Sequence, residues 1–203
     1  MPKTILPTAA ENDLTDSHIA SGQYAVRVGV HGQVGRFASS RESFHRAARV
    51  VCRTARGLEI GTVLNVLRSS TIGEGANDGQ ILRRMTPEDQ LLWHNLEQLA
   101  AQSHQACQQW LSSSKSSDRL LEVEPLFDGR TLYFHFLDQA STETDRQLER
   151  LVSIFQETVT NSPFSHLLEH GCGPGCGTAE AERGCGTACH SCSVSSGCGV
   201  KRR

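Results

Sequence analysis

Alternation of apolar and polar residues predicts strands in the first third of the chain. Residues 24–30 follow the period of two that is typical of a half-buried strand, with apolar residues at Tyr24, Val26, Val28 and Val30. A turn after this run predicts a hairpin into a second short strand at residues 34–38. Two β-branched, apolar runs at residues 48–54 and 58–67 predict another strand pair, joined by a tight turn at Arg56 and Gly57.

A glycine-rich stretch at residues 71–80 separates these strands from the rest of the chain. It contains neither of the glycine patterns that bind phosphate, GxxxxGK[ST] or GxGxxG. We therefore predict a plain surface loop.

Two helices and a hairpin follow. Thr86 and Pro87, with two acidic residues after them, predict the start of a long helix that ends near Leu111. An Asp128-Gly129 turn between the apolar runs 120–126 and 131–137 is a strong hairpin signal. Apolar residues at helical spacing then predict a second amphipathic helix: Leu148, Leu151, Val152, Phe155 and Val159. Residues 163–168 predict one last edge strand, interrupted by Pro163.

This order predicts an α+β protein. From residue 58 onward the elements follow a ferredoxin-like (split βαβ) arrangement, which a small β-rich unit precedes. We expect a mobile leader at residues 1–20, an α+β domain at 21–169 and an irregular Gly/Cys-rich tail at 170–203.

Composition narrows the class of protein. The 203 residues carry a formal net charge of −2, which argues against a dedicated, highly basic nucleic-acid binder. No apolar run is long enough to span a membrane. The N-terminus has no apolar core of a secretory signal, so we expect a cytoplasmic protein.

Cysteine is the most unusual feature of the chain. Six of the eight cysteines lie in the tail: Cys172, Cys176, Cys185, Cys189, Cys192 and Cys198. In a reducing compartment, such short spacings favour metal binding over disulfides. Four thiolates suffice for zinc or for an iron–sulfur cluster, and the spacing favours neither. The alternative is a low-complexity tail whose thiols carry no ligand. Cys52 and Cys107 stand alone and are expected to be buried apolar fillers.

Residues 27–56 are rich in positive charge, with seven arginines and only one acidic residue. Arg49, Arg53 and Arg56 are the best candidates for contact with an anion, either RNA phosphate or an acidic partner. The alternative is a solvated face without a ligand.

Catalysis is not expected. The sequence contains no GxSxG or HExxH motif. Glu122 and Glu124 share one face of a strand, and we expect them to be solvated rather than an acid/base pair. His135 alternates with two phenylalanines and is expected to be a surface histidine.

Three segments resemble the polymerase-suppressor (PSP) C-terminal domain family, whose bacterial members include YaaT-type regulators. Residues 56–63 are similar to its RGxExGxV strand, residues 83–89 to its RxATxED segment at a helix start, and residues 123–136 to its FDG hairpin. The resemblance extends over residues 21–176. It departs at residues 171–177, where no adjacent cysteine pair occurs, and at 164–169, where the usual basic strand has no arginine.

The resemblance implies a cytoplasmic, non-enzymatic regulator. Such proteins join small helical partner proteins, influence ribonuclease-dependent RNA maturation and carry iron–sulfur clusters on cysteines near the domain end. We therefore expect an adaptor for RNA-processing or signalling partners whose tail binds metal. The alternative is a metal-handling protein in which the folded domain only carries the tail.

Overall fold

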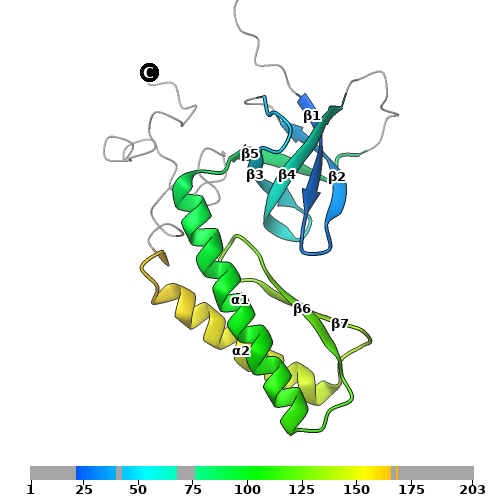
Figure 1. The fold of residues 1–203 in the computed structure, drawn as a ribbon, viewed down its shortest axis with the longest axis vertical. Helices are drawn as coiled ribbons and strands as arrows, with labels where there is room; N and C mark the ends of the chain where they lie inside the picture. The colour runs from blue at the N-terminus through cyan, green and yellow to red at the C-terminus, as the bar shows by residue number, and fades with distance from the viewer. Residues whose placement is uncertain (1–21, 40–42, 68–75, 166–167, 169–203) are drawn as a thin grey trace, which may run out of the picture.

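The computed structural model describes residues 22–39, 43–67, 76–165 and 168. Its α+β class agrees with the prediction. A barrel forms the upper part of the molecule, and a layer of two helices and two strands extends below it (Figure 1). The elements are β1 (Gly22–Val28), β2 (Gln33–Ser39), β3 (Arg49–Thr54), β4 (Gly57–Leu67), β5 (Gly79–Arg84), α1 (Pro87–Ser113), β6 (Leu120–Pro125), β7 (Leu132–Phe136) and α2 (Thr142–Thr160).

The barrel closes in the order β1-β2-β5-β3-β4, with β4 returning to β1. The predicted hairpins β1–β2 and β3–β4 are both present and antiparallel. Alternate side chains of these strands fill the interior, among them Val26, Phe37, Val50 and Val63. Gly61 permits this packing, because a Cβ there would lie 2.6 Å from Cγ1 of Val26.

The fifth strand was not predicted. β5 begins at Gly79, inside the stretch expected to be a surface loop, and runs to Arg84. It pairs antiparallel with β3 and parallel with β2. Only two of its residues, Ile81 and Leu82, are strongly apolar, so its strand conformation depends on these neighbours rather than on a local pattern.

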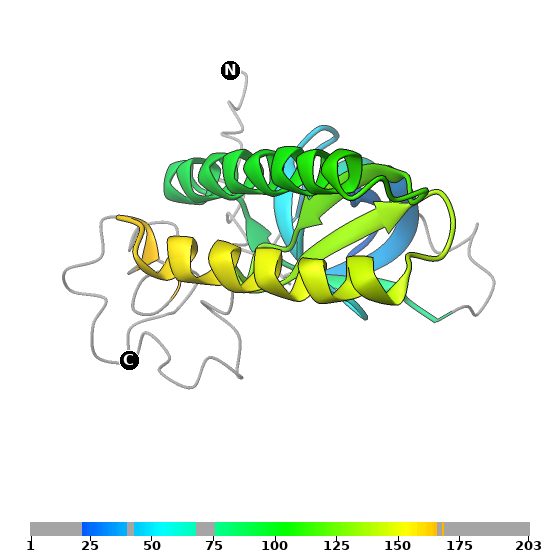
Figure 2. The ribbon, with the colours of Figure 1, turned by 90° about the horizontal axis from the view of Figure 1, so that it is seen from below.

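The long helix α1 starts as expected. Thr86 caps it, and Thr86 and Asp89 exchange side-chain-to-backbone hydrogen bonds in a capping box. The predicted hairpin is also confirmed, with β6 pairing antiparallel with β7. Viewed from below, α1 and α2 lie side by side (Figure 2).

One apolar core joins the barrel to this layer. It combines the barrel's outward-facing Val51 and Leu82 with residues of the helices and the hairpin: Leu92, Leu96, Leu99, Ala100, Val123, Phe127, Leu132, Phe155 and Val159. Phe127 N–H also donates to the carbonyl of Leu58 at 2.8 Å, which ties the β6–β7 turn to β4.

The described residues do not form the predicted ferredoxin-like sheet. β4 is held in the barrel by β1 and β3, and β6 pairs with β7 in a separate two-stranded sheet. The expected edge strand is also wrong, since residues 163–165 and 168 belong to no strand. Ser165 N–H instead bonds the carbonyl of Ser162, which makes a turn around Pro163.

The predicted leader at 1–20 and the tail at 170–203 lie outside the described residues. Within the described part, neither helix is long and apolar enough to cross a membrane.

Candidate functional site

The six tail cysteines (Cys172, Cys176, Cys185, Cys189, Cys192 and Cys198) all lie outside the described residues. Among the residues that the structure does describe, no group of three His, Cys, Asp or Glu side chains could hold a metal. Cys52 and Cys107 are buried, as predicted. Burial raises the pKa of both thiols, that of Cys107 to about 11. They therefore pack as apolar side chains.

The three candidate arginines occupy different environments. Arg56 lies in the β3–β4 turn and forms internal ion pairs. Arg53 is half-buried on β3 and makes polar contacts of its own. Arg49 is exposed at the start of β3 and lines a cleft. The structure therefore does not bring the three together as one surface strip.

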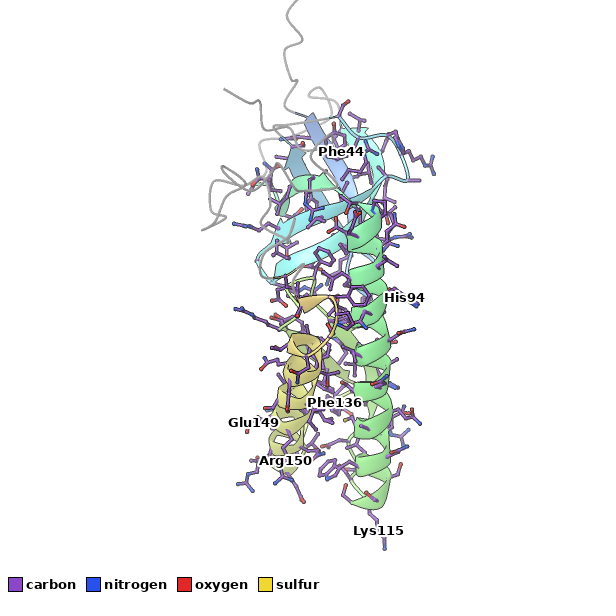
Figure 3. The ribbon with its side chains drawn as sticks, turned by 90° about the vertical axis from the view of Figure 1, so that its left-hand side faces the viewer. Phe44, His94, Lys115, Phe136, Glu149 and Arg150 are labelled. Atoms are coloured by element: carbon purple, nitrogen blue, oxygen red, sulfur yellow. The ribbon has the colours of Figure 1, made fainter. Side chains whose placement is uncertain are left out.

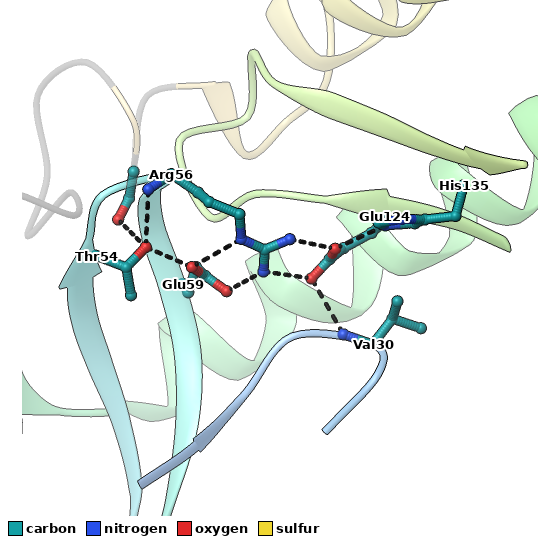
Figure 4. Close-up of polar contacts among 7 residues, drawn as sticks. Val30, Thr54, Arg56, Glu59, Glu124 and His135 are labelled. Atoms are coloured by element: carbon teal, nitrogen blue, oxygen red, sulfur yellow. Dashed lines mark hydrogen bonds and ion pairs between the residues drawn. The ribbon is translucent and has the colours of Figure 1, made fainter. Parts of the chain in front are cut away.

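Arg56 is the centre of a polar junction between the barrel and the two-stranded sheet (Figure 4). Its Nη1 donates to Glu124 Oε2 at 2.7 Å, and its Nη2 donates to Glu124 Oε1 at 3.0 Å. The same guanidinium donates to both carboxylate oxygens of Glu59 on β4. One cation thus pairs with two carboxylates, one from each layer of the molecule.

Backbone and neighbouring side chains complete the junction. Val30 N–H donates to Glu124 Oε1 at 3.1 Å, and His135 Nε2 lies 3.0 Å from Glu124 Oε2. Gly29 allows this close approach: its φ is +73°, and a Cβ there would lie 2.8 Å from Nη2 of Arg56. The hairpin turn of β1–β2, the turn of β3–β4 and the β6–β7 sheet therefore meet at one ion pair.

The charges at this junction stabilise one another. Burial alone would raise the pKa of Glu124, but hydrogen bonds from Arg56, His135 and Val30 N–H hold it below its ordinary value. Hydrogen bonds to Glu124 and Glu59 likewise hold the pKa of Arg56 above its usual range. Both partners are ionised at neutral pH.

Aromatic side chains cover the junction. Arg56 lies over the Tyr133 ring, 5.4 Å from its centroid. The His135 ring packs edge-on against His31 of the β1–β2 turn, with centroids 4.5 Å apart. His135 is thus a partly covered histidine with a carboxylate partner, close to the expected surface role.

The expectation that Glu122 and Glu124 are both solvated is wrong for Glu124. Only 5% of Glu124 is exposed. Its partner Arg56 lies in a turn 68 residues earlier in the chain, so no local pattern could indicate the pairing. Glu122 is exposed, as predicted.

A cleft of about 400 Å³ opens beside this junction, between the barrel, α1 and β6. Its barrel wall carries Arg27, Arg49 and Thr62, and its helix wall carries Trp93 and Glu97. Glu59 and Glu124, already paired with Arg56, also line it. Here a sequence-predicted site residue, Arg49, borders a cavity that an aromatic ring, that of Trp93, also lines.

The predicted site residues did not include Arg27, Thr62, Trp93 or Glu97. Strand alternation alone places Arg27 on the outer face of β1, because Val26 and Val28 point inward. The cleft forms only because barrel closure brings β1, β3 and β4 together next to α1. No local sequence pattern indicates that closure.

The chain is similar to a known protein family. The model described as the PSP1 C-terminal conserved region matches residues 79–159, from the first residue of β5 to the last turn of α2. This match confirms the predicted resemblance to the PSP C-terminal domain family over these residues. Comparisons with curated proteins and with solved structures found no match to the chain.

Proposed function

Because residues 79–159 are a PSP1 C-terminal conserved region, we propose that this protein is a cytoplasmic regulatory adaptor that scaffolds RNA-processing or signalling partners. The partners we propose are small helical proteins and a ribonuclease complex. The family resemblance supports this choice.

The observation that supports a scaffold is the junction at Arg56. An adaptor must hold its binding surfaces in a constant relative position. Arg56 ties β4 of the barrel to β6 of the second layer through two carboxylates, and a shared apolar core lies beside it. The Arg56–Glu59–Glu124 cluster therefore stabilises the arrangement of the two layers.

We further propose that the tail is a metal-binding element. Its six cysteines offer soft thiolates, the donors that select zinc or an iron–sulfur cluster. Cys185, Cys189 and Cys192 are separated by three and two residues, which is close enough to share one centre. Cys176 or Cys198 would supply a fourth thiolate, and Cys172 would serve a second centre or exchange with Cys176.

Anaerobic purification with visible absorption and metal analysis tests the tail. Cys189→Ser is expected to remove most of the bound metal, whereas Cys107→Ser, a matched change at a buried thiol outside the tail, leaves metal content unchanged. Equal metal content in the Cys189→Ser variant and the parent would refute the metal-binding proposal.

The cysteine density also favours a second candidate, a metal-handling protein whose folded part only carries the tail. The two functions differ in the effect of deleting residues 171–203. An adaptor lacking the tail still co-purifies with a ribonuclease or a small helical protein from its own cells. A metal-handling protein loses its metal and has no such partner to retain.

A further inference from the structure

Three residues form a row across the outer face of the barrel. Arg27 of β1 pairs directly with Thr62 of β4, and Arg49 of β3 pairs with the same Thr62 from the other side. Directly paired residues share a face of the sheet, and the buried neighbours Val26 and Val63 show that this face is the outer one. Two strand spacings separate the arginines, which places their backbones about 10 Å apart.

The two arginines lack an acidic partner within the described part of the chain. None of the ion pairs found there includes Arg27 or Arg49, and both side chains are exposed. By contrast, the buried acids of the same cleft, Glu59 and Glu124, both form ion pairs with Arg56. Two guanidiniums on either side of a hydroxyl form a donor set suited to the oxygens of a phosphate.

The helix wall of the cleft offers different chemistry. Trp93 is half-buried, with its ring packed near Phe127 at a centroid distance of 6.2 Å. Glu97 follows one helical turn later on the same side of α1, and both residues line the cleft. Ala100 and Ala101 line the same wall with small side chains, which project little into the cleft. An aromatic ring beside a carboxylate can stack on a base and accept a hydrogen bond from its exocyclic amine.

We infer that this cleft binds one nucleotide of a single-stranded RNA, with a phosphate between Arg27 and Arg49 and the base against Trp93. Glu97 accepts from the amino group of the base. The choice of RNA rests on the proposed function, whereas the nucleotide chemistry rests on the cleft. An acidic peptide would satisfy the arginines but would bring its charge toward Glu97 and Glu122, the exposed acids on the other walls.

The fluorescence of Trp93 can report binding in this cleft. The chain has two tryptophans, so Trp110→Phe leaves Trp93 as the only one. In this background, a single-stranded RNA 12-mer of mixed sequence is titrated while tryptophan fluorescence is recorded. Stacking is expected to quench the emission of Trp93 in a saturable manner.

The arginine row is tested in the same background. Arg27→Ala with Arg49→Ala is expected to raise the Kd for the 12-mer at least tenfold. It should also reduce the slope of log K against log salt by about 0.7, the value for one lost phosphate contact with a single strand. Arg146→Ala with Arg150→Ala removes an equal charge from exposed positions of α2 and is expected to leave both the Kd and the slope unchanged. Arg150 lies far from the barrel (Figure 3).

Three outcomes would overturn the inference: no quenching by the 12-mer, equal affinity of the double variant and the parent, or displacement of the 12-mer by an equimolar acidic peptide. Saturable quenching by a mononucleotide alone, without binding of the 12-mer, would show a small-molecule site and refute RNA as the ligand. Retention of a ribonuclease partner by a protein that binds no RNA would leave the proposed function standing and remove only this inference.

Discussion

Arg56 and Glu124 form a two-pronged ion pair that joins the two layers of the molecule, with N···O distances of 2.7 and 3.0 Å. The pair spans 68 residues of sequence. Because the same guanidinium also forms an ion pair with Glu59, its loss would leave two buried carboxylates without their shared partner.

We therefore expect Arg56→Ala to lower the free energy of unfolding by about 2–4 kcal/mol. This is less than the roughly 3–5 kcal/mol lost when one partner of a fully buried pair is removed, because solvent screens the 29% exposed Arg56 side chain. Arg46→Ala, at an exposed arginine of the same barrel, should change stability by less than about 0.5 kcal/mol. Urea unfolding followed by circular dichroism measures both. Equal midpoints for the two variants would show that the junction contributes nothing to stability.

The Glu124 carboxylate should make stability depend on pH in the acidic range. Its pKa is lower in the folded protein than in the unfolded chain, so the unfolded chain takes up the proton first as the pH falls. The stabilisation is complete above the unfolded value of about 4.3 and is lost as the pH falls through the folded pKa. We expect the stability difference between the parent and Glu124→Gln to shrink from about pH 5 to pH 3.

Glu149→Gln serves as the control, since Glu149 is exposed on α2 (Figure 3). Its stability difference from the parent should be small at every pH. A Glu124→Gln difference that is constant from pH 7 to pH 3 would contradict the depressed pKa.

Local signals predicted some elements well and others not at all. The Asp128-Gly129 turn and the Thr86 cap act within a few residues, and both are present as expected. β5 was missed because Gly79–Arg84 becomes a strand only by pairing with β2 and β3. The burial of Glu124 was missed for the same reason, since its partner is distant in sequence.

The barrel interior should not tolerate a side chain at position 61. A Cβ on Gly61 would lie 2.6 Å from Val26 Cγ1 and 3.1 Å from Cys52 Sγ. Overpacking of this kind costs about 1–3 kcal/mol, so Gly61→Ala should lower the urea midpoint.

A double variant separates this clash from other effects. Val26→Ala makes room for the new methyl group, so Gly61→Ala should cost less in the Val26→Ala background than in the parent. Additive losses in the double variant would indicate that Gly61 acts through backbone conformation rather than through contact with Val26.

The described fold should not depend on the tail. Its cores are built from residues 24–159 together with Phe164 and Leu168 at their margin. Deletion of residues 171–203 is therefore expected to leave a single cooperative thermal transition. A zinc finger, by contrast, unfolds when its metal is removed. Loss of that transition in differential scanning calorimetry would show that the tail is part of the folding unit.

The pairing of β5 also affects how the chain can be divided and how it is made. β5 opens the family region at Gly79, yet its partners β2 and β3 both precede that region. A fragment starting at residue 79 would carry a strand without neighbours, while one ending before it would leave β2 and β3 with open edges prone to self-association. On the ribosome, the first four strands must therefore wait until Arg84 has emerged before the barrel can close. The family region and the barrel are therefore not structurally separable units.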